Sequence, residues 1–455
     1  MAPKNPLSLW QSLSYAMPTM AIYFLFGPLF ILQGIYSKYF GMALTTIAVV
    51  LFFANLLDAV TDPVVGYISD RYYRRTGKRK PFILIGALLF LISSYFLYMP
   101  PASVTALYFF GWYVTATLML KVFDIPHIAW PTEITCCPQE RNKLYSLRFV
   151  LVFFGSLLFY AMTQLPFFDS TEITPRTLKW CIFVGGLLLL PTLLSCIKWV
   201  PSNEVTNNDE VDNKFKRCSL VQVIFSNKPF LLFLLAIVLV GSGVSVWTSL
   251  IFIYTDSYLD LGAQFARIYI VSNLASMGAL CVWYKAANHF GNIKATLVSV
   301  SVATFGLFYT GLVMPASNAA FSLSLAVILV NVGSATFASM AASLLSHIVD
   351  YGTWKFSADH AATYFSIYTM MLKVNFALGS AIGLGIAGWY GFEPSSTLGQ
   401  SLDAIFGLRL AISWLPFCIA VAGLVVIGFF SINSRRHAII LKRLNERAAR
   451  TATAT

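Results

Sequence analysis

The sequence predicts an all-α membrane protein with twelve transmembrane helices arranged in two six-helix bundles. Of its 455 residues, 58% are hydrophobic and only 11% are charged. Soluble proteins carry about 25% charged residues, so this composition indicates a chain that lies in lipid. Twelve apolar runs are long enough, at about 20 residues each, to cross a bilayer as helices. Continuous runs of this length exclude an outer-membrane barrel, whose strands are short and alternate polar with apolar residues.

The expected helices follow one another along the chain and are separated by polar or basic connections. The first apolar run begins near Leu13 and is too long for the core of a signal peptide, so it is expected to remain as a membrane helix. The twelve runs are centred near Phe26, Phe53, Phe90, Met119, Leu157, Leu189, Leu239, Ala275, Phe305, Leu329, Phe376 and Val421.

The 31 lysine and arginine residues predict the orientation of the chain. With the N-terminus in the cytoplasm, 24 of them fall on the cytoplasmic side and five outside, while Lys121 and Lys373 lie within the bilayer. Cytoplasmic loops carry the excess of basic residues. We therefore expect a multi-pass integral protein of a bacterial inner membrane or plasma membrane, with both termini cytoplasmic. This scatter also accounts for the net charge of +12 without a nucleic-acid partner, which would require one basic face.

A long polar stretch divides the chain into two halves. We expect an N-terminal bundle over residues 1–200, a cytoplasmic linker over 201–228 and a C-terminal bundle over 229–434. The basic tail, residues 435–455, has the pattern of a short amphipathic helix attracted to membrane lipid. Two six-helix halves related by an axis along the membrane normal describe the major facilitator fold, which binds its solute near the midplane.

Two carboxylates lie inside the second apolar run. Asp58 and Asp62 are four residues apart, so a helix places both on one face. A charge in hydrocarbon is costly unless it is paired, solvated or protonated, and such residues usually line an ion or substrate path. Two close carboxylates should therefore bind a proton, a metal cation such as sodium, or a basic side chain. The alternative is a purely structural ion pair.

Further intramembrane charges lie on the fourth and eleventh runs. Lys121 and Asp124 share a helix face, and either Asp124 accepts hydrogen bonds from solute hydroxyls or the two residues neutralise each other. Lys373 needs an acidic partner, for which Asp58, Asp62 and Asp124 are candidates. The histidines, including His127, are too scattered for a metal site and are expected to pack in the interior or in loops.

The connection after the second run carries a signature of its own. Gly66, Asp70 and Arg71 are followed by Gly77-Lys-Arg-Lys80, a pattern that resembles the loop signature of the major facilitator superfamily. We expect Gly66 to permit close helix approach, Asp70 to pair with another helix end and the arginines to contact helix C-termini. These residues are expected to act in conformational gating. A plain basic loop would explain the arginines but not the spacing of the glycine and the aspartate.

Several motifs together resemble the glycoside–pentoside–hexuronide:cation symporters, the melibiose permease family within the major facilitators. They are Asp58-Ala-Val-Thr-Asp-Pro-Val-Val-Gly-Tyr-Ile-Ser-Asp-Arg71, Phe123-Asp-Ile-Pro126, Pro131-Thr-Glu-Ile-Thr135, Val349-Asp-Tyr-Gly-Thr-Trp354 and Thr369-Met-Met-Leu-Lys373. The resemblance covers nearly the whole chain. It implies that Asp58 and Asp62 are cation-site carboxylates, that Asp124 and Arg148 border the sugar, and that Thr369 and Lys373 border both sites. Asp350, within the fourth motif, is expected to act in gating.

Two departures from the family pattern affect the expected cargo and ion. Tyr23 stands near where the permease has a sugar-binding aspartate, and Lys121 stands where it has a cation-binding hydroxyl. An ammonium beside Asp58 and Asp62 would occupy the place of sodium, so the sequence favours H⁺ over Na⁺ as the coupling ion.

The sequence therefore predicts a monomeric, cation-coupled secondary transporter for a small-molecule substrate, a sugar or glycoside, and no cofactor. A second hypothesis keeps the fold but carries lysophospholipid or another amphiphile. A third is a non-transporting membrane receptor or enzyme, although no nucleophile–base pair or phosphate loop supports an enzyme.

Overall fold

The computed structural model describes residues 7–135, 138–166, 171–201, 227–356, 361–396 and 399–430, with three further positions in the tail. Residues 202–226 of the predicted linker and most of the predicted tail lie outside these residues. All regular elements in the described part are helices, which confirms the all-α prediction.

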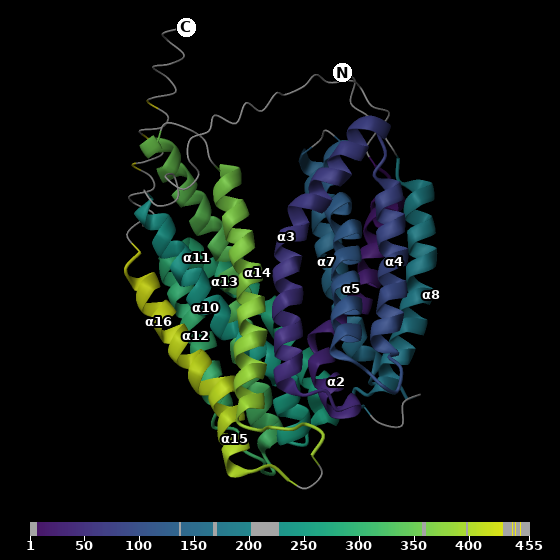
Figure 1. The fold of residues 1–455 in the computed structure, drawn as a ribbon. Helices are drawn as coiled ribbons and strands as arrows, with labels where there is room; N and C mark the ends of the chain where they lie inside the picture. Colours follow the sequence, from purple (N-terminus) through teal and green to yellow (C-terminus); the bar gives the residue numbers. More distant parts are fainter. Residues whose placement is uncertain are drawn as a thin grey trace. The chain divides into compact units, whose positions relative to one another are not determined.

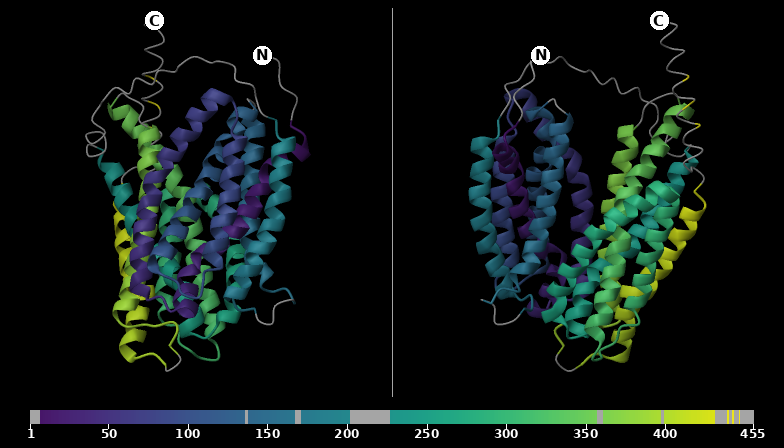
Figure 2. Two further views of the ribbon diagram at one scale, coloured as in Figure 1. Left: turned by 45° about the vertical axis from the view of Figure 1, so that its right-hand side comes forward. Right: turned by 180° about the vertical axis from the view of Figure 1, so that it is seen from behind.

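The chain folds into two compact units. The first contains residues 1–211, 255–270 and 393–399, and the second contains the remainder. Figure 1 labels the main helices of both units, and Figure 2 shows each from two further sides. The first unit holds α1 (Leu9–Phe26), η1 (Gly27–Phe30), α2 (Leu32–Phe40), α3 (Leu44–Thr76), α4 (Lys80–Tyr98), α5 (Ala106–Ala129), α6 (Pro131–Ile134), α7 (Pro138–Met162) and α8 (Pro175–Trp199).

The second unit is built from the later helices of the chain. It holds α10 (Lys228–Ile253), most of α11 (Gly262–Phe290), α12 (Asn292–Thr310), α13 (Ala319–Phe356), α14 (Ala361–Trp389), α15 (Leu402–Arg409), η3 (Leu410–Trp414) and α16 (Leu415–Gly428). The π-helical turn η2 (Tyr254–Tyr258) leads into the segment 255–270, which packs with the first unit. The domain boundaries predicted from the sequence stay a prediction, because the linker that separates them lies outside the described residues.

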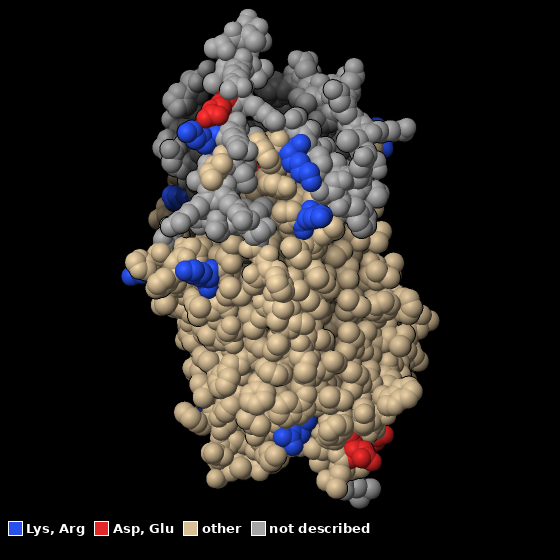
Figure 3. All heavy atoms as spheres, turned by 90° about the vertical axis from the view of Figure 1, so that its left-hand side faces the viewer, with Lys and Arg blue, Asp and Glu red and all other residues tan. Residues whose placement is uncertain are grey.

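Eleven helices of the described chain are long and apolar enough to cross a membrane. The described apolar part of α13, Ala319–Ala335, is shorter, although the helix itself extends over 38 residues. Twelve expected spans are therefore matched by eleven candidates and one helix whose apolar part is short. On the face in Figure 3, a broad band shows no charged side chain, and coloured charges lie above and below it. Such a band is what lipid contact requires.

The charged loop after α3 is shaped by a glycine. Gly77 caps the C-terminus of α3 with φ 67°, and its backbone N–H bonds to the Tyr73 carbonyl. This left-handed conformation suits glycine because it lacks a Cβ atom. The chain then turns into α4, whose N-cap is Arg79. The sequence Gly77-Lys-Arg-Lys80 thus forms a sharp turn, which brings Arg79 back toward the end of α3.

Helix pairs in the first unit approach closely where a glycine faces a neighbouring backbone. A Cβ atom at Gly86 of α4 would collide with the Phe123 backbone nitrogen of α5. At Gly155 of α7 it would collide with the Met20 carbonyl oxygen of α1. Small residues permit such contacts, which give close van der Waals packing between membrane helices. The contact at Gly86 also positions α5, the helix that carries Lys121 and Asp124.

We predict that Gly86→Ala destabilises the protein by about 1–3 kcal/mol, since the added methyl group collides with the backbone of α5. The measurement is thermal unfolding of the purified protein in detergent. Gly111→Ala is the matched control. Gly111 also lies in a membrane helix, but a Cβ atom there would meet no atom within 4 Å. Equal unfolding temperatures for the two variants would contradict close packing at Gly86.

Candidate functional site

The carboxylates of α3 meet a lysine of α5. Lys121 Nζ lies 2.5 Å from Asp58 Oδ1 and also forms an ion pair with Asp62. It donates a further hydrogen bond to the main-chain oxygen of Asp58 at 2.5 Å. The lysine side chain is 12% exposed, and the two aspartates are 19% and 32% exposed. The expected pair of carboxylates is therefore present on one helix face, and the cation between them is the chain's own ammonium group.

A second ion pair lies one helical turn further along α5. Asp124 pairs with Arg148 of α7, and Tyr23 of α1 lies within hydrogen-bonding reach of the same guanidinium. The side chains of Arg148 and Asp124 are 13% and 19% exposed. Lys121 therefore does not neutralise Asp124, so that one of the two alternatives left open by the sequence is wrong. Each charge on α5 instead has a partner on a different helix.

His127 completes the surroundings of Arg148. Its ring is fully buried, stacks on Tyr15 at 4.4 Å between ring centroids and lies 5.1 Å from the Phe123 ring. Its Nε2 atom is 2.9 Å from the Tyr15 carbonyl oxygen, and its Nδ1 atom is 3.3 Å from Arg148 Nε. The expected packing role is therefore only part of what this residue does. The signal available in the sequence for the contact with Arg148 was that His127 follows Asp124 by three residues and therefore shares its helix face.

The predicted gating residues Gly66, Asp70 and Arg71 lie in the C-terminal part of α3. Arg79 Nη2 lies 2.8 Å from Asp70 Oδ1, and Arg79 Nη1 donates to Ser69 Oγ at 2.9 Å, so Asp70 does pair with the start of the next helix. A Cβ atom at Gly66 would meet no atom within 4 Å, and the role expected of this glycine stays a prediction. Arg71 is exposed, and the arginine buried at this turn is Arg79.

Three predicted site residues belong to the second unit. Thr369 and Lys373 lie on α14, and Asp350 lies on α13. Thr369 Oγ1 donates to the Ser366 carbonyl oxygen at 2.9 Å. Lys373 and Asp350 are half-buried. The cross-half ion pair expected for Lys373 and the gating role of Asp350 stay predictions.

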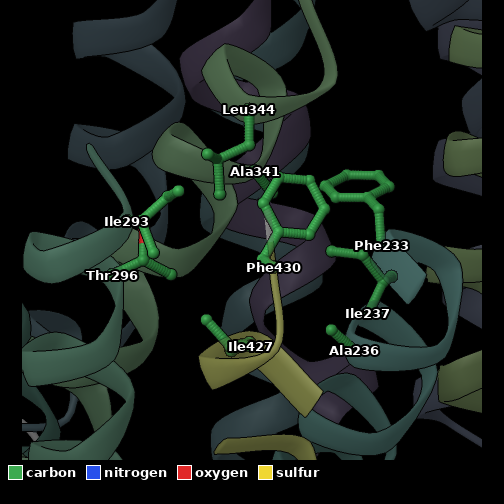
Figure 4. A pocket seen from close by; sticks show the side chains of 9 residues that line it. All are labelled: Phe233, Ala236, Ile237, Ile293, Thr296, Ala341, Leu344, Ile427 and Phe430. Carbon is green, nitrogen blue, oxygen red and sulfur yellow. The ribbon is translucent and has the colours of Figure 1, made fainter. Parts of the chain in front are cut away.

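One cavity described in the second unit is unsuited to a polar solute. It encloses about 20 Å³, room for about one water molecule, and its lining is apolar apart from one threonine. Figure 4 shows the side chains that surround it, which come from α10, α12, α13, α16 and the short stretch after α16: Phe233, Ala236, Ile237, Ile293, Thr296, Ala341, Leu344, Ile427 and Phe430. Within the described residues, no group of three His, Cys, Asp or Glu side chains is placed to hold a metal ion.

A charged cluster in the first unit was not predicted from the sequence. Lys38 Nζ, on α2, lies 2.9 Å from Glu172 Oε1 and 2.8 Å from Asp256 Oδ2. The hydroxyl of Tyr39 donates to Glu172 at 3.0 Å, and Gly262 leaves room for Asp256, because a Cβ there would collide with its Oδ1 atom. Two signals were available in the sequence. Asp256 lies at the end of an apolar run, and Lys38 and Glu172 carry opposite charges in two short connections on the same predicted side of the membrane.

This cluster attaches the segment 255–270 to the rest of the first unit. Thr171 Oγ1 donates to the Ala263 carbonyl oxygen at 2.6 Å, and Arg267 Nε donates to Gln164 Oε1 at 2.6 Å. The Asp256 side chain is 3% exposed, so its carboxylate depends on Lys38 for compensation. An ion-pair network of this kind can hold the segment in one conformation and release it when a partner is neutralised.

We predict that Glu172→Gln lowers the unfolding temperature at about pH 7 and lowers it by less at about pH 3. Burial raises the pKa of the Glu172 carboxyl, but the hydrogen bond and charge of Lys38 outweigh burial and hold the pKa below its ordinary value. The folded-state pKa is thus the lower one, so the stabilisation is present above the ordinary pKa and is lost as pH falls through the lowered value.

Lys38→Met is the companion variant, since it removes the cation and should abolish the pH dependence that Glu172 contributes. Burial alone would lower the pKa of Lys38, but the two carboxylates raise it, so this side chain stays charged throughout the range tested. If the wild type kept its full advantage over Glu172→Gln at about pH 3, Glu172 would act through something other than its charge.

Comparison with known proteins shows the family to which the chain belongs. A sequence model of the family described as "MFS/sugar transport protein" matches residues 14–434. The chain is 24% identical to the putative glycoside/cation symporter YagG of Escherichia coli, over 97% of this chain and 96% of that protein. It is 23% identical to the putative sulfoquinovose importer of E. coli, over 98% and 97% of the two chains.

Among solved structures, that of the nucleoside transporter NupG matches with a TM-score of 0.65 and 12% identity, over 92% of this chain and 99% of that one. This likeness supports the predicted major facilitator fold. The family match covers nearly the whole chain and confirms the resemblance that the motifs predicted. The chain is a multi-pass integral membrane transporter, not an enzyme, and it belongs to the MFS/sugar transport protein family of the major facilitator superfamily.

Proposed function

We propose that this transporter carries a sugar or glycoside across the membrane together with a proton, by alternating access of a site that includes Asp124 and Arg148. The observation that carries the proposal is the pair of linked charge clusters around α5 in the first unit. The names of the E. coli relatives, a glycoside/cation symporter and a sulfoquinovose importer, support a sugar-like cargo.

The Asp124–Arg148 pair has the chemistry that a hydroxylated solute requires. A carboxylate accepts hydrogen bonds from hydroxyl groups, and a guanidinium offers five N–H donors in a planar fork. Tyr23 adds a phenol that both donates and accepts, together with an apolar ring face on which a sugar ring can pack. Arg148 and Asp124 remain partly exposed, so a solute can reach them.

Lys121 is expected to decide the coupling ion. Its ammonium lies between Asp58 and Asp62, where a sodium ion would require oxygen ligands and no neighbouring positive charge. With Asp124 and Arg148, the five groups carry three negative and two positive charges, a net charge of −1 when all are ionised. One proton neutralises the set. A carboxylate released from Lys121 in one conformation becomes protonatable there, which couples the proton to the conformational change.

The first experiment is uptake into proteoliposomes, with labelled sugars and glycosides compared with labelled lysophospholipid. Accumulation of a sugar driven by an inward proton gradient supports the proposal. Preference for lysophospholipid would favour the second hypothesis. The absence of an acidic residue at the position of Tyr23 would then fit a ligand that is less like a sugar. We further propose that the transporter is a monomer. We also propose that both of its termini lie in the cytoplasm, because the distribution of lysine and arginine residues indicates that orientation.

We predict that sodium does not stimulate wild-type uptake and that Lys121→Thr gains sodium dependence, because a hydroxyl oxygen replaces the ammonium between the two carboxylates. Initial uptake rates are measured against sodium concentration at fixed proton gradient. Lys294→Thr, at an exposed position near the start of α12, is the matched control and should behave as wild type. Saturable sodium stimulation of the wild type that is lost in Asp58→Asn would show the inference on Lys121 to be wrong.

We predict that Asp124→Asn lowers the apparent affinity for the solute by about tenfold or more, since each charge-assisted hydrogen bond contributes about 1.5–3 kcal/mol. The KM of uptake is compared at equal levels of folded protein. Asp403→Asn changes an exposed aspartate of α15 and should leave the KM unchanged. An unaltered KM in Asp124→Asn would mean that Asp124 serves the fold and does not touch the solute.

A further inference from the structure

We propose that His127 is a positioning residue for Arg148, which holds the guanidinium in the orientation that receives the solute. The proposal rests on the proposed function, because it assigns Arg148 to the solute site. Three observations carry it: the contact between His127 Nδ1 and Arg148 Nε at 3.3 Å, the contact between His127 Nε2 and the Tyr15 carbonyl at 2.9 Å, and the complete burial of the ring.

The hydrogen-bond network assigns the tautomer of His127. The Tyr15 carbonyl oxygen can only accept, so the hydrogen lies on Nε2. In the neutral ring Nδ1 is then an acceptor, and Arg148 Nε is a donor that cannot accept. An imidazolium would instead direct an N–H group at the guanidinium. Both contacts are therefore satisfied together only by the neutral ring with its hydrogen on Nε2.

The ring is held from several sides. Tyr15 stacks on it with an interplanar angle of 6°, and the Tyr15 hydroxyl donates to the His127 carbonyl oxygen at 2.9 Å. Tyr15 is itself fully buried. Two reciprocal hydrogen bonds thus join α1 to α5 around the imidazole, and the position of Nδ1 follows from them. A fixed acceptor of this kind orients its partner without loss of rotamer entropy at the moment of binding.

The consequence for Arg148 is a restricted guanidinium plane. His127 and Asp124, three residues apart on α5, take its Nε and Nη2 groups. The donors that remain are at Nη1 and the second hydrogen of Nη2, and they are directed by the two anchors. Loss of the His127 contact would leave Arg148 Nε without its acceptor, and the guanidinium would be freer to rotate about its contact with Asp124. Affinity for the solute should fall although both binding residues are still present.

Substitutions at His127 separate positioning from packing. In His127→Asn the amide oxygen takes the place of Nδ1, whereas His127→Gln keeps a donor near Nε2, and His127→Phe keeps only the ring stack. Positioning predicts a KM within about twofold of wild type for His127→Asn and raised about tenfold for His127→Gln and His127→Phe, with little change in maximal rate. Packing predicts the opposite order, with the phenylalanine variant best tolerated and affinity following thermal stability. That opposite order would overturn the proposal.

A double-mutant cycle adds a second criterion. If His127 acts through Arg148, His127→Phe raises the KM by less than about twofold in an Arg148→Lys background, because lysine has no Nε donor. Equal effects in both backgrounds would also refute the proposal. His289→Asn, on an exposed histidine of α11, is the matched control and should leave the KM unchanged.

A spectroscopic measurement needs no solute and remains decisive where a variant binds none. The ¹⁵N resonances of the labelled histidine side chains, with His127 assigned by its absence in His127→Phe, should report a hydrogen on Nε2 and none on Nδ1. Arg148→Lys should shift the Nδ1 resonance, whereas Arg267→Lys should not, since Arg267 contacts Gln164. A hydrogen on Nδ1, or no response to Arg148→Lys, would disprove the contact. Failure of every sugar to bind the wild type would instead refute the proposed function.

Discussion

The compensation of half-buried carboxylates by cations from neighbouring helices is the constraint on which the first unit depends. Asp58 and Asp62 share Lys121, and Asp124 is paired with Arg148. An isolated charge in the membrane interior costs several kcal/mol, so removal of one partner leaves the other uncompensated. These pairs therefore join α3, α5 and α7 with more energy at stake than an exposed ion pair would carry.

Helix α5 is central to this arrangement because three consecutive turns of it carry Lys121, Asp124 and His127. Its position is set by apolar close packing at Gly86, and its polar side chains are then matched to partners on three other helices. Close packing and polar pairing are thus interdependent: a shift of α5 by the width of a methyl group would misplace all three groups. Membrane helices rely on such small-residue contacts because lipid provides no hydrophobic force between them.

The Lys38–Glu172–Asp256 cluster shows the same physics away from the proposed solute site. One lysine compensates two carboxylates, and one of these is nearly completely buried in the described segment 255–270. Charge compensation thus also attaches the segment 255–270 to the rest of the first unit. The Asp70–Arg79 pair at the turn after α3 is a third example, in which the buried guanidinium links the end of one helix to the start of the next.

The sequence by itself determined the all-helical membrane fold, the face shared by Asp58 and Asp62, and the family, because span length and helical periodicity are local properties of the chain. It left the partner of each charge open. That Lys121 pairs with α3 rather than with Asp124, and that His127 contacts Arg148 from 21 residues away, was decided only by the tertiary structure. Which helices become neighbours, and at what rotation, depends on packing between segments distant in the chain, so the contacts at Lys38 and the open space at Gly66 could not be read from residue spacing.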